Sequence, residues 1–164
     1  MQCEPRYDPA MKAIRPARED EAARLTALCL RSKAHWGYDA DFLKASVPSL
    51  TVSKTMIAEN RVLVAEDRGG LLLGVAAANP LKDGAFDLTL LFVEPDAIGN
   101  GVGEKLFAAI AAQIGREGAR RLLIESDPNA EGFYKRLGAR RIGDAPSSAV
   151  PGRMLPLLEF VISQ

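Results

Sequence analysis

Three glycines at alternate positions, Gly99, Gly101 and Gly103, form the most informative pattern in this sequence of 164 residues. They follow an apolar stretch that ends at Val93 and precede a segment whose apolar residues have helical spacing. The first N–H groups of a helix have no acceptor within it, and the helix dipole favours negative charge there. Missing side chains would let an anion reach the backbone. The pattern therefore predicts an anion site at a helix start, with a pyrophosphate as the natural ligand.

Two other glycine motifs that bind phosphate fit this segment less well. A Walker loop ends in Gly-Lys-Ser/Thr, whereas Glu104 follows the last glycine here. A dinucleotide fingerprint stands directly after a strand, whereas here a five-residue loop intervenes and the last glycine falls one position early. Two interpretations remain: an acyl-coenzyme A loop, and a glycine-rich helix start that binds no ligand.

Residues 93–103 resemble the acyl-coenzyme A loop of the GNAT family of N-acetyltransferases. That loop reads Arg/Gln-x-x-Gly-x-Gly/Ala after a strand that ends in Val-x-Pro. The matching residues are Val93, Pro95, Gly99, Gly101, Val102 and Gly103. The sequence departs at Ile98, where the family often has Arg or Gln, but the pyrophosphate contacts are largely with the main chain. The resemblance implies that acetyl-CoA is bound by Leu91, Phe92, Val93, Ile98, Gly99, Asn100, Gly101, Val102 and Gly103.

A second segment, residues 129–139, resembles the family pattern Asn-x-x-Ala/Gly-x-x-Phe-Tyr-x-x-x-Gly-Phe. The matching residues are Asn129, Gly132, Phe133, Tyr134 and Gly138, and Ala139 replaces the usual aromatic residue. The resemblance implies that Asn129 hydrogen-bonds the pantetheine arm, and that Phe133 and Tyr134 also contact the cofactor. The alternatives are that Asn129 only caps a helix and that Tyr134 is only a partly buried aromatic residue.

Acetyl transfer from a thioester needs a positioned amine, a group that takes its proton, an oxyanion donor and a proton for the thiolate. The resemblance places the main-chain N–H of Val93 as the oxyanion donor and Tyr134 beside the sulfur. A phenol with a pKa near 10 matches a departing alkyl thiolate, so Tyr134 is the expected general acid. Glu125 and Glu94 are the candidate bases, with a solvated or helix-facing carboxylate as the alternative for each, and proton removal through water is equally open.

The amine substrate is expected near the break between two predicted helices. His35, Trp36 and Tyr38 stand in this break, where the family's acceptor pocket usually forms, and core packing is the alternative for the aromatic residues. The loop 147–153 is a candidate to close over the substrate, and Arg153 is a candidate to meet a carboxylate there.

The elements that must position these residues follow from apolar periodicity and from glycine and proline. Strands are predicted at 12–15, 62–65, 71–78, 86–93, 121–125, 140–143 and 155–162. Helices are predicted at 20–34, at 39–47 before Pro48, after Gly103 as far as 115–118, and at 130–137, and residues 49–60 are expected to form a loop that has room for one turn of helix. The order predicts an α/β (α+β) fold with a mixed sheet of six or seven strands flanked by helices. The resemblance adds a splay between two parallel strands, as in the GNAT fold.

Composition limits the classes of partner. Lys and Arg number 21 and Asp and Glu number 21, so duplex nucleic acid is disfavoured as the main partner. The longest apolar run, 71–78, is far shorter than the ~20 residues of a membrane span. One histidine and two cysteines, Cys3 and Cys29, predict no metal site and a reduced, cytoplasmic compartment.

The sequence thus predicts a flexible extension over residues 1–10 and a single GNAT acetyltransferase domain over 11–164. The expected activity is direct transfer of an acetyl group from acetyl-CoA to a primary amine of a small molecule or peptide. The alternatives are a non-catalytic CoA-binding sensor or partner module and, less well supported, a dinucleotide-dependent enzyme. A homodimer is open, and neither nucleic acid nor a membrane is an expected partner.

Overall fold

The structure, a computed structural model, describes residues 11–163. Its strands are β1 (Met11–Pro16), β2 (Val62–Asp67), β3 (Leu72–Pro80), β4 (Ala85–Val93), β5 (Arg121–Glu125), β6 (Arg140–Pro146) and β7 (Met154–Val161). Its α-helices are α1 (Ala22–Ala34), α2 (Ala40–Leu50), α3 (Lys54–Ala58), α4 (Val102–Arg116) and α5 (Glu131–Arg136). Three short 3₁₀ turns, η1 (Glu19–Glu21), η2 (Pro95–Ala97) and η3 (Pro128–Ala130), precede α1, α4 and α5. The expected extension over residues 1–10 lies outside the described residues.

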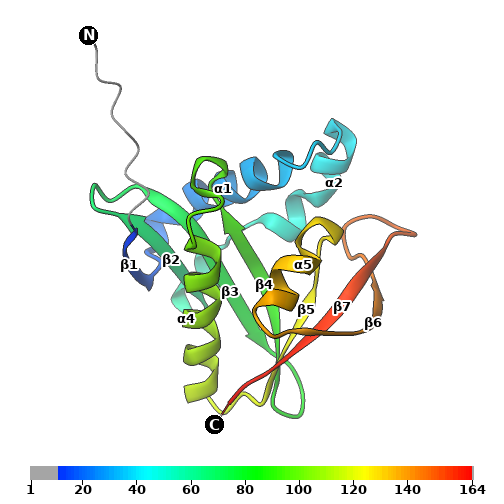
Figure 1. Ribbon diagram of the computed structural model, residues 1–164. Coiled ribbons are helices and arrows are strands. Elements are labelled where there is room, and N and C mark those ends of the chain that lie inside the picture. Colours follow the sequence, from blue (N-terminus) through cyan, green and yellow to red (C-terminus); the bar gives the residue numbers. More distant parts are fainter. Residues whose placement is uncertain (1–10, 164) are drawn as a thin grey trace.

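The seven strands form one mixed sheet in the order β1-β2-β3-β4-β5-β7-β6, which confirms the predicted fold class (Figure 1). All neighbouring strands are antiparallel except β4 and β5. This parallel pair is hydrogen-bonded at its beginning only, where Ala85, Phe86 and Asp87 face Arg121, Leu122 and Leu123. β4 continues for six residues beyond Asp87 without this partner, so the two strands splay apart toward their carboxyl ends.

Helices cover both faces of the sheet because residues of the central strands are apolar on both sides. α4 and α5 lie in front of the sheet in Figure 1, and α1 and α2 lie behind it. In β2, Leu63 and Ala65 pack in the core with α4, whereas Val62 and Val64 pack in the core with α1 and α3. The alternation of a strand thus assigns each residue to one of two cores.

One prediction about the helical region was wrong. α2 does not end before Pro48 but continues to Leu50, which is buried. Pro48 has no N–H to donate to the carbonyl of Lys44, four residues earlier. Lys44 is exposed, so water can bind this carbonyl and the helix can continue. The turn of helix allowed for within the loop 49–60 is α3, whose start is capped by the Ser53 side chain accepting from the N–H of Met56 at 3.1 Å. Within the described residues, no helix has the length and apolar character needed to cross a membrane.

A buried ion pair joins the first strand to the start of α1. Glu21, 2% exposed, accepts hydrogen bonds from Nη1 and Nη2 of Arg15, both at 2.8 Å, and from the N–H of Arg18 at 2.8 Å. The hydrogen bonds from Arg15 outweigh the burial of the carboxylate and lower the pKa of Glu21 to about 2, from an ordinary 4.5. A carboxylate with a lowered pKa in the folded state stabilises the fold above its ordinary pKa and loses this effect as the pH falls.

We therefore expect Glu21→Gln to lower the free energy of unfolding by about 2 kcal/mol at pH 7, because it removes a charged hydrogen-bond acceptor from a buried site. The deficit relative to the wild type should shrink as the pH falls from about 4.5 toward 2. Urea unfolding of both proteins across this range measures it. Glu19→Gln, an exposed carboxylate of the same turn, is the matched control and should cost little at any pH. A deficit independent of pH would contradict the assignment.

Candidate active site

The glycine segment lies between β4 and α4, as its pattern predicts. Gly99 and Gly101 have positive φ angles of 88° and 79°, and Gly101 is the N-cap of α4. Such angles strain any residue with a side chain. A Cβ added at either glycine would meet no atom within 4 Å, so open space lies beside this backbone. The first N–H groups of α4 have no acceptor within the helix, so the turn can hold an anion.

The splay between β4 and β5 exposes main-chain groups of β4. The N–H of Glu94 donates to the carbonyl of Leu73 in β3 at 2.7 Å, and Val93 is paired opposite Gly74. Successive residues of a strand direct their hydrogen-bonding groups to opposite sides. The N–H of Val93 therefore points away from β3 and into the gap where β5 has diverged, and the backbone of Leu91 points the same way. Both can bind an extended ligand in the gap.

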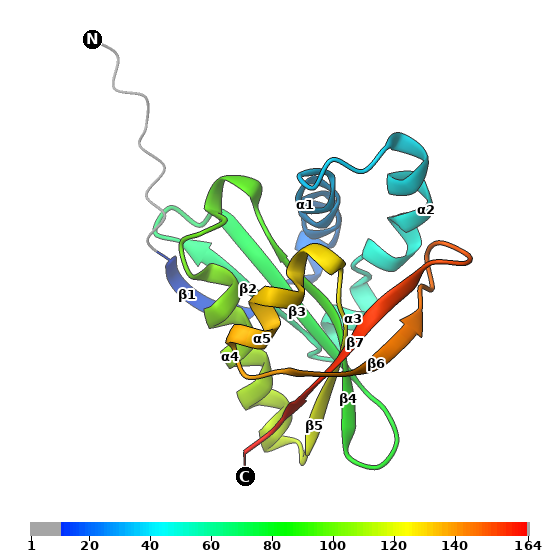
Figure 2. The same cartoon turned by 45° about the vertical axis from the view of Figure 1, so that its right-hand side comes forward.

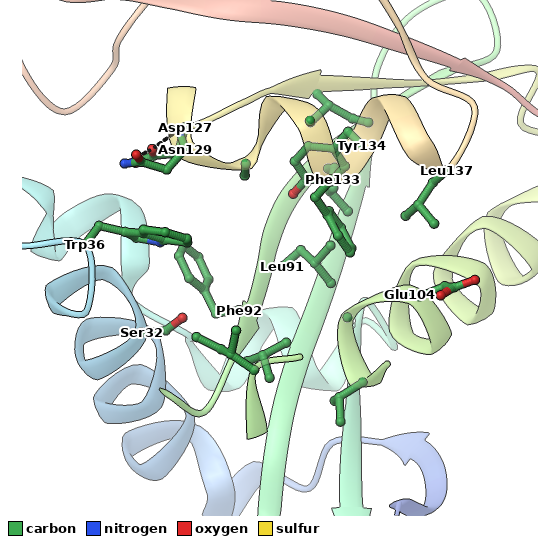
Figure 3. A pocket seen from close by; sticks show the side chains of 18 of the residues that line it. Ser32, Trp36, Leu91, Phe92, Glu104, Asp127, Asn129, Phe133, Tyr134 and Leu137 are labelled. Atoms are coloured by element: carbon green, nitrogen blue, oxygen red, sulfur yellow. Dashed lines mark hydrogen bonds between the residues drawn. The ribbon is translucent and has the colours of Figure 1, made fainter. Parts of the chain in front are cut away.

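A cavity of about 740 Å³ occupies this gap and reaches the glycine turn. Figure 3 shows residues from α1, β4, α4 and α5 around it. Its lining includes most of the predicted site residues, namely Trp36, Leu91, Phe92, Val93, Ile98, Gly99, Gly101, Val102, Gly103, Glu125, Asn129, Phe133 and Tyr134. Five predicted residues do not line it: His35, Tyr38, Glu94, Asn100 and Arg153. Asn100 instead donates from its side chain to the carbonyl of Ala97 at 3.2 Å.

Tyr134 is held by α5 at the side of the cavity, where Figure 3 shows its ring beside that of Phe133. The ring centroids of these two residues are 5.1 Å apart, and Phe107 lies 6.0 Å from Tyr134 on the other side. Only 7% of Tyr134 is exposed. Burial, and then the negative charge of Asp127, raise the pKa of the phenol, so it stays protonated at neutral pH and can donate a proton.

The two carboxylates predicted as bases differ in whether an ion pair already occupies them. Glu125 ends β5, is exposed and lines the cavity. Glu94 is taken up by a two-pronged ion pair with Arg31, in which both N···O distances are 2.8 Å. Of these two predicted bases, Glu125 is the one whose carboxylate is free of an ion pair among residues 11–163.

Asp87 is a third carboxylate, which does not line the cavity but feels the charge of Glu125, and the sequence reasoning missed it. It lies on β4 opposite Leu123 of β5, two residues before Glu125. Burial and then the charge of Glu125 raise the pKa of Asp87, while a hydrogen bond with Thr89 acts against them. Thr89 in turn accepts from the side chain of Asn79 at 3.1 Å. The signal in the sequence was a carboxylate inside an otherwise apolar central strand.

A polar cluster closes the end of the cavity near α1. We name it the Asp127 cluster, and it consists of Lys33, Tyr38, Asp127, Asn129 and Arg153. Asp127 Oδ2 accepts from Lys33 Nζ at 2.6 Å and from the Tyr38 hydroxyl at 2.7 Å. Arg153 Nη2 donates to the Tyr38 hydroxyl at 3.0 Å, which brings the loop 147–153 to this end of the cavity. The sequence reasoning missed Lys33 and Asp127.

The remaining aromatic candidates are placed around this cluster. Tyr38 stacks on Phe42 with ring centroids 4.1 Å apart, so it supports the wall without lining the cavity. Trp36 is 45% exposed and lines the cavity from the end of α1. His35 is exposed and touches the edge of Trp36, at a centroid distance of 5.5 Å. Among the described residues, no group of three or more His, Cys, Asp or Glu side chains is arranged to hold a metal ion.

Comparisons with known proteins agree with this architecture. A family model described as an acetyltransferase (GNAT) domain matches residues 17–149. A search of curated proteins finds no match.

Solved structures share the fold over nearly the whole chain. A GCN5-related N-acetyltransferase from Rhodopseudomonas palustris is 24% identical, with a TM-score of 0.71 over 91% of this chain and 94% of that one. The PaiA N-acetyltransferase from Thermoplasma acidophilum, solved with coenzyme A, is 14% identical, with a TM-score of 0.74 over 91% and 98%. A GNAT family acetyltransferase from Brucella melitensis, solved with acetyl-CoA, is 22% identical, with a TM-score of 0.64 over 93% and 88%. At these identities the likeness concerns the fold.

Proposed function

Because the chain belongs to the GNAT acetyltransferase family, we propose that it transfers the acetyl group of acetyl-CoA directly to a primary amine. The observation that carries the proposal is the continuity of one cavity. It runs from the open glycine turn, along the unpaired edge of β4, to a buried phenol and a free carboxylate.

The residues present fit acetyl-CoA. The space beside Gly99 and Gly101 suits the diphosphate, because bare N–H groups and the helix dipole both favour an anion there. The backbone of Leu91 and Val93 suits the amide groups of the pantetheine arm, which would lie between β4 and β5 like an added strand. When bound, acetyl-CoA supplies an activated acyl group as a thioester.

The main-chain N–H of Val93 and the phenol of Tyr134 then have separate tasks. Val93 donates to the carbonyl oxygen as negative charge develops there, and a fixed donor in a cavity stabilises that charge more than water does. Tyr134 gives its proton to the departing sulfur. Burial raises the pKa of this phenol above that of a free phenol, so it keeps its proton across the neutral range. It is therefore a weaker acid than the match to an alkyl thiolate expected from the sequence, and its position beside the cavity is what favours it as the donor.

We propose that Glu125 is the base that takes the proton from the amine. This carboxylate lines the cavity at the end of β5, on the opposite strand of the splay from Val93. Asp87 lies on the neighbouring strand β4, and the charge of Glu125 contributes to raising the pKa of Asp87. Two neighbouring carboxylates attract the amine in its ammonium form. One of them can then take the proton, before the free amine attacks the thioester.

Glu125→Gln is therefore expected to lower kcat/KM for the amine by about tenfold at neutral pH. The effect is smaller than for many general bases because Glu125 is exposed and water can replace part of its role. Thiol release as a function of pH measures it. Glu59→Gln, an exposed carboxylate just after α3, is the matched control and should leave kcat/KM unchanged. If kcat/KM for the amine were unchanged in Glu125→Gln at every pH, Glu125 would not be the base, and water would be the group that removes the proton.

Two measurements test the proposed function as a whole. Acetyl-CoA at 100 times its Kd should stabilise the protein against thermal unfolding by about 2.7 kcal/mol, and NADH should not. A panel of primary amines should then show acceptor-dependent release of the CoA thiol. Stabilisation without thiol release for any amine would favour a CoA-binding sensor, and stabilisation by NADH alone would favour a dinucleotide-dependent protein.

A further inference from the structure

The Asp127 cluster contains two cations and a single carboxylate. Lys33 Nζ lies 2.6 Å from Asp127 Oδ2, and Arg153 Nη2 lies 3.9 Å from the same oxygen. The other carboxylate oxygen, Oδ1, accepts from the backbone N–H of Asn129 at 2.9 Å and from its side chain at 3.0 Å. Asp127 can balance one of the two cations, so the cluster carries a net charge of +1.

The phenol in the cluster does not offset this charge. Burial and then the carboxylate of Asp127 raise the pKa of Tyr38, so its hydroxyl stays neutral. It donates to Asp127 at 2.7 Å and accepts from Arg153 at 3.0 Å. Tyr38 therefore fixes the positions of the two charged groups without neutralising either.

Both cations have donors left for a ligand. An ammonium has three N–H donors and a guanidinium has five. Among the described residues, the side chain of Lys33 makes one hydrogen bond, to Asp127, and the side chain of Arg153 makes one, to Tyr38. Their side chains are only 12% and 21% exposed, and both lie over the rings of Tyr38 and Phe42. Partial burial strengthens their attraction for an anion relative to a fully hydrated lysine or arginine.

The surplus charge stands at one end of the cavity that also contains Glu125. Lys33 and Asp127 line this cavity. Arg153, at the end of the loop between β6 and β7, does not line it, but its Nη2 lies 3.9 Å from the Asp127 carboxylate. Figure 2 shows that loop reaching toward α2. Glu125 is two residues before Asp127, which corresponds to about 7 Å along an extended chain. Glu125 and Lys33 thus bring a negative and a positive group to the same cavity.

This inference rests on the proposed function and specifies its substrate. We infer that the amine substrate also carries a carboxylate, which binds to Lys33 and Arg153 while the amino group lies at Glu125. Lys33 and Arg153 are then residues that determine specificity. A polyamine is disfavoured, because its second ammonium would face these two cations.

The test compares amino acids with their own primary amides as acceptors. Glycine, β-alanine and 4-aminobutyrate vary the distance between the amine and the carboxylate, and each amide keeps the amine while removing the negative charge. An α-amino amide is less basic and offers more free amine at neutral pH, so for glycine this comparison works against the inference. We expect the best amino acid to exceed its amide in kcat/KM by about tenfold or more, mainly through KM. Equal values for all three pairs, or higher values for putrescine or phosphoethanolamine, would overturn the inference.

Variants assign the effect to the two cations. Lys33→Gln and Arg153→Gln should each reduce the ratio of kcat/KM between acid and amide to near 1, and Lys33→Arg and Arg153→Lys should retain more of it. Arg140→Gln, an exposed arginine on β6 outside the cavity, is the matched control and should keep the ratio. A role in stability alone would lower both members of each pair and leave the ratio intact, which would contradict the inference.

The inference and the proposed function fail in distinguishable ways. Thiol release with amides as good as with acids would keep the acetyltransferase and refute the carboxylate preference. If no amine released thiol, calorimetric titration of each acid and amide into the CoA-saturated protein would still compare their Kd values. Tighter binding of the acid, lost in Arg153→Gln, would support the carboxylate site, and equal binding would overturn it.

Discussion

Replacing Tyr134 by phenylalanine should lower kcat by about 100-fold or more while the Kd for acetyl-CoA stays nearly constant. The change removes one hydroxyl and keeps the ring that packs between Phe107 and Phe133, so the cavity keeps its shape. Without a proton donor the thiolate would leave at its full charge, inside a part of the cavity where burial disfavours charge. An interaction made only during the reaction appears in kcat and not in cofactor binding.

Thiol release under saturating conditions gives kcat, and calorimetry gives the Kd. Tyr38→Phe is an instructive comparison, because it also removes a phenol but from the Asp127 cluster, behind the cavity wall. It should alter the KM of the amine substrate more than kcat. If Tyr134→Phe turned over at the wild-type rate with an established amine, Tyr134 would not be the general acid.

The second large effect is expected at the glycine turn. Gly101→Val should weaken binding of acetyl-CoA by about 100-fold, because the added side chain would enter the open space beside the backbone and displace the diphosphate. The loss of one or two charge-assisted hydrogen bonds is worth about 3 kcal/mol, and every 1.4 kcal/mol is tenfold in Kd. The positive φ of 79° adds conformational strain in the folded state.

A control must separate this strain from the loss of the binding site. Gly70 in the turn between β2 and β3 has a φ of 83° and equally open surroundings, but it lies outside the cavity. Gly70→Val should therefore cost similar stability and leave the Kd for acetyl-CoA unchanged. Calorimetric titration of acetyl-CoA into both variants gives the two Kd values and separates strain from loss of the binding site. A Gly101→Val protein that bound acetyl-CoA as tightly as the wild type would remove the glycine turn from the binding site.

The elements of the fold were predictable because their signals are local. β5 was predicted with its exact bounds, and the apolar run of β4 marked it as a central strand. The positive φ values at Gly99 and Gly101 are a property of residue type, so the turn before α4 was visible in the sequence. The exception was Pro48. There, an exposed carbonyl allowed the helix to continue although proline argues against it.

The residues predicted to contact the cofactor were identified because two motifs in the sequence carry them, and their contacts with the cofactor stay a prediction. Asp87, Lys33 and Asp127 belong to neither family pattern, and their relevance comes from their neighbours. Asp87 matters because β4 and β5 are adjacent and parallel at that position. Charge on one strand gives no indication in the sequence of which strand will lie beside it.

The sequence by itself thus determined the elements, the mixed sheet and the glycine turn, since each depends on residue type and short-range periodicity. Only the tertiary structure decided which charges meet. Asp127 is 94 residues from Lys33 and 89 from Tyr38, and Arg153 is 115 from Tyr38. These contacts arise where the splay of β4 from β5 and the loop 147–153 bring distant segments together, and no local pattern encodes such a meeting point.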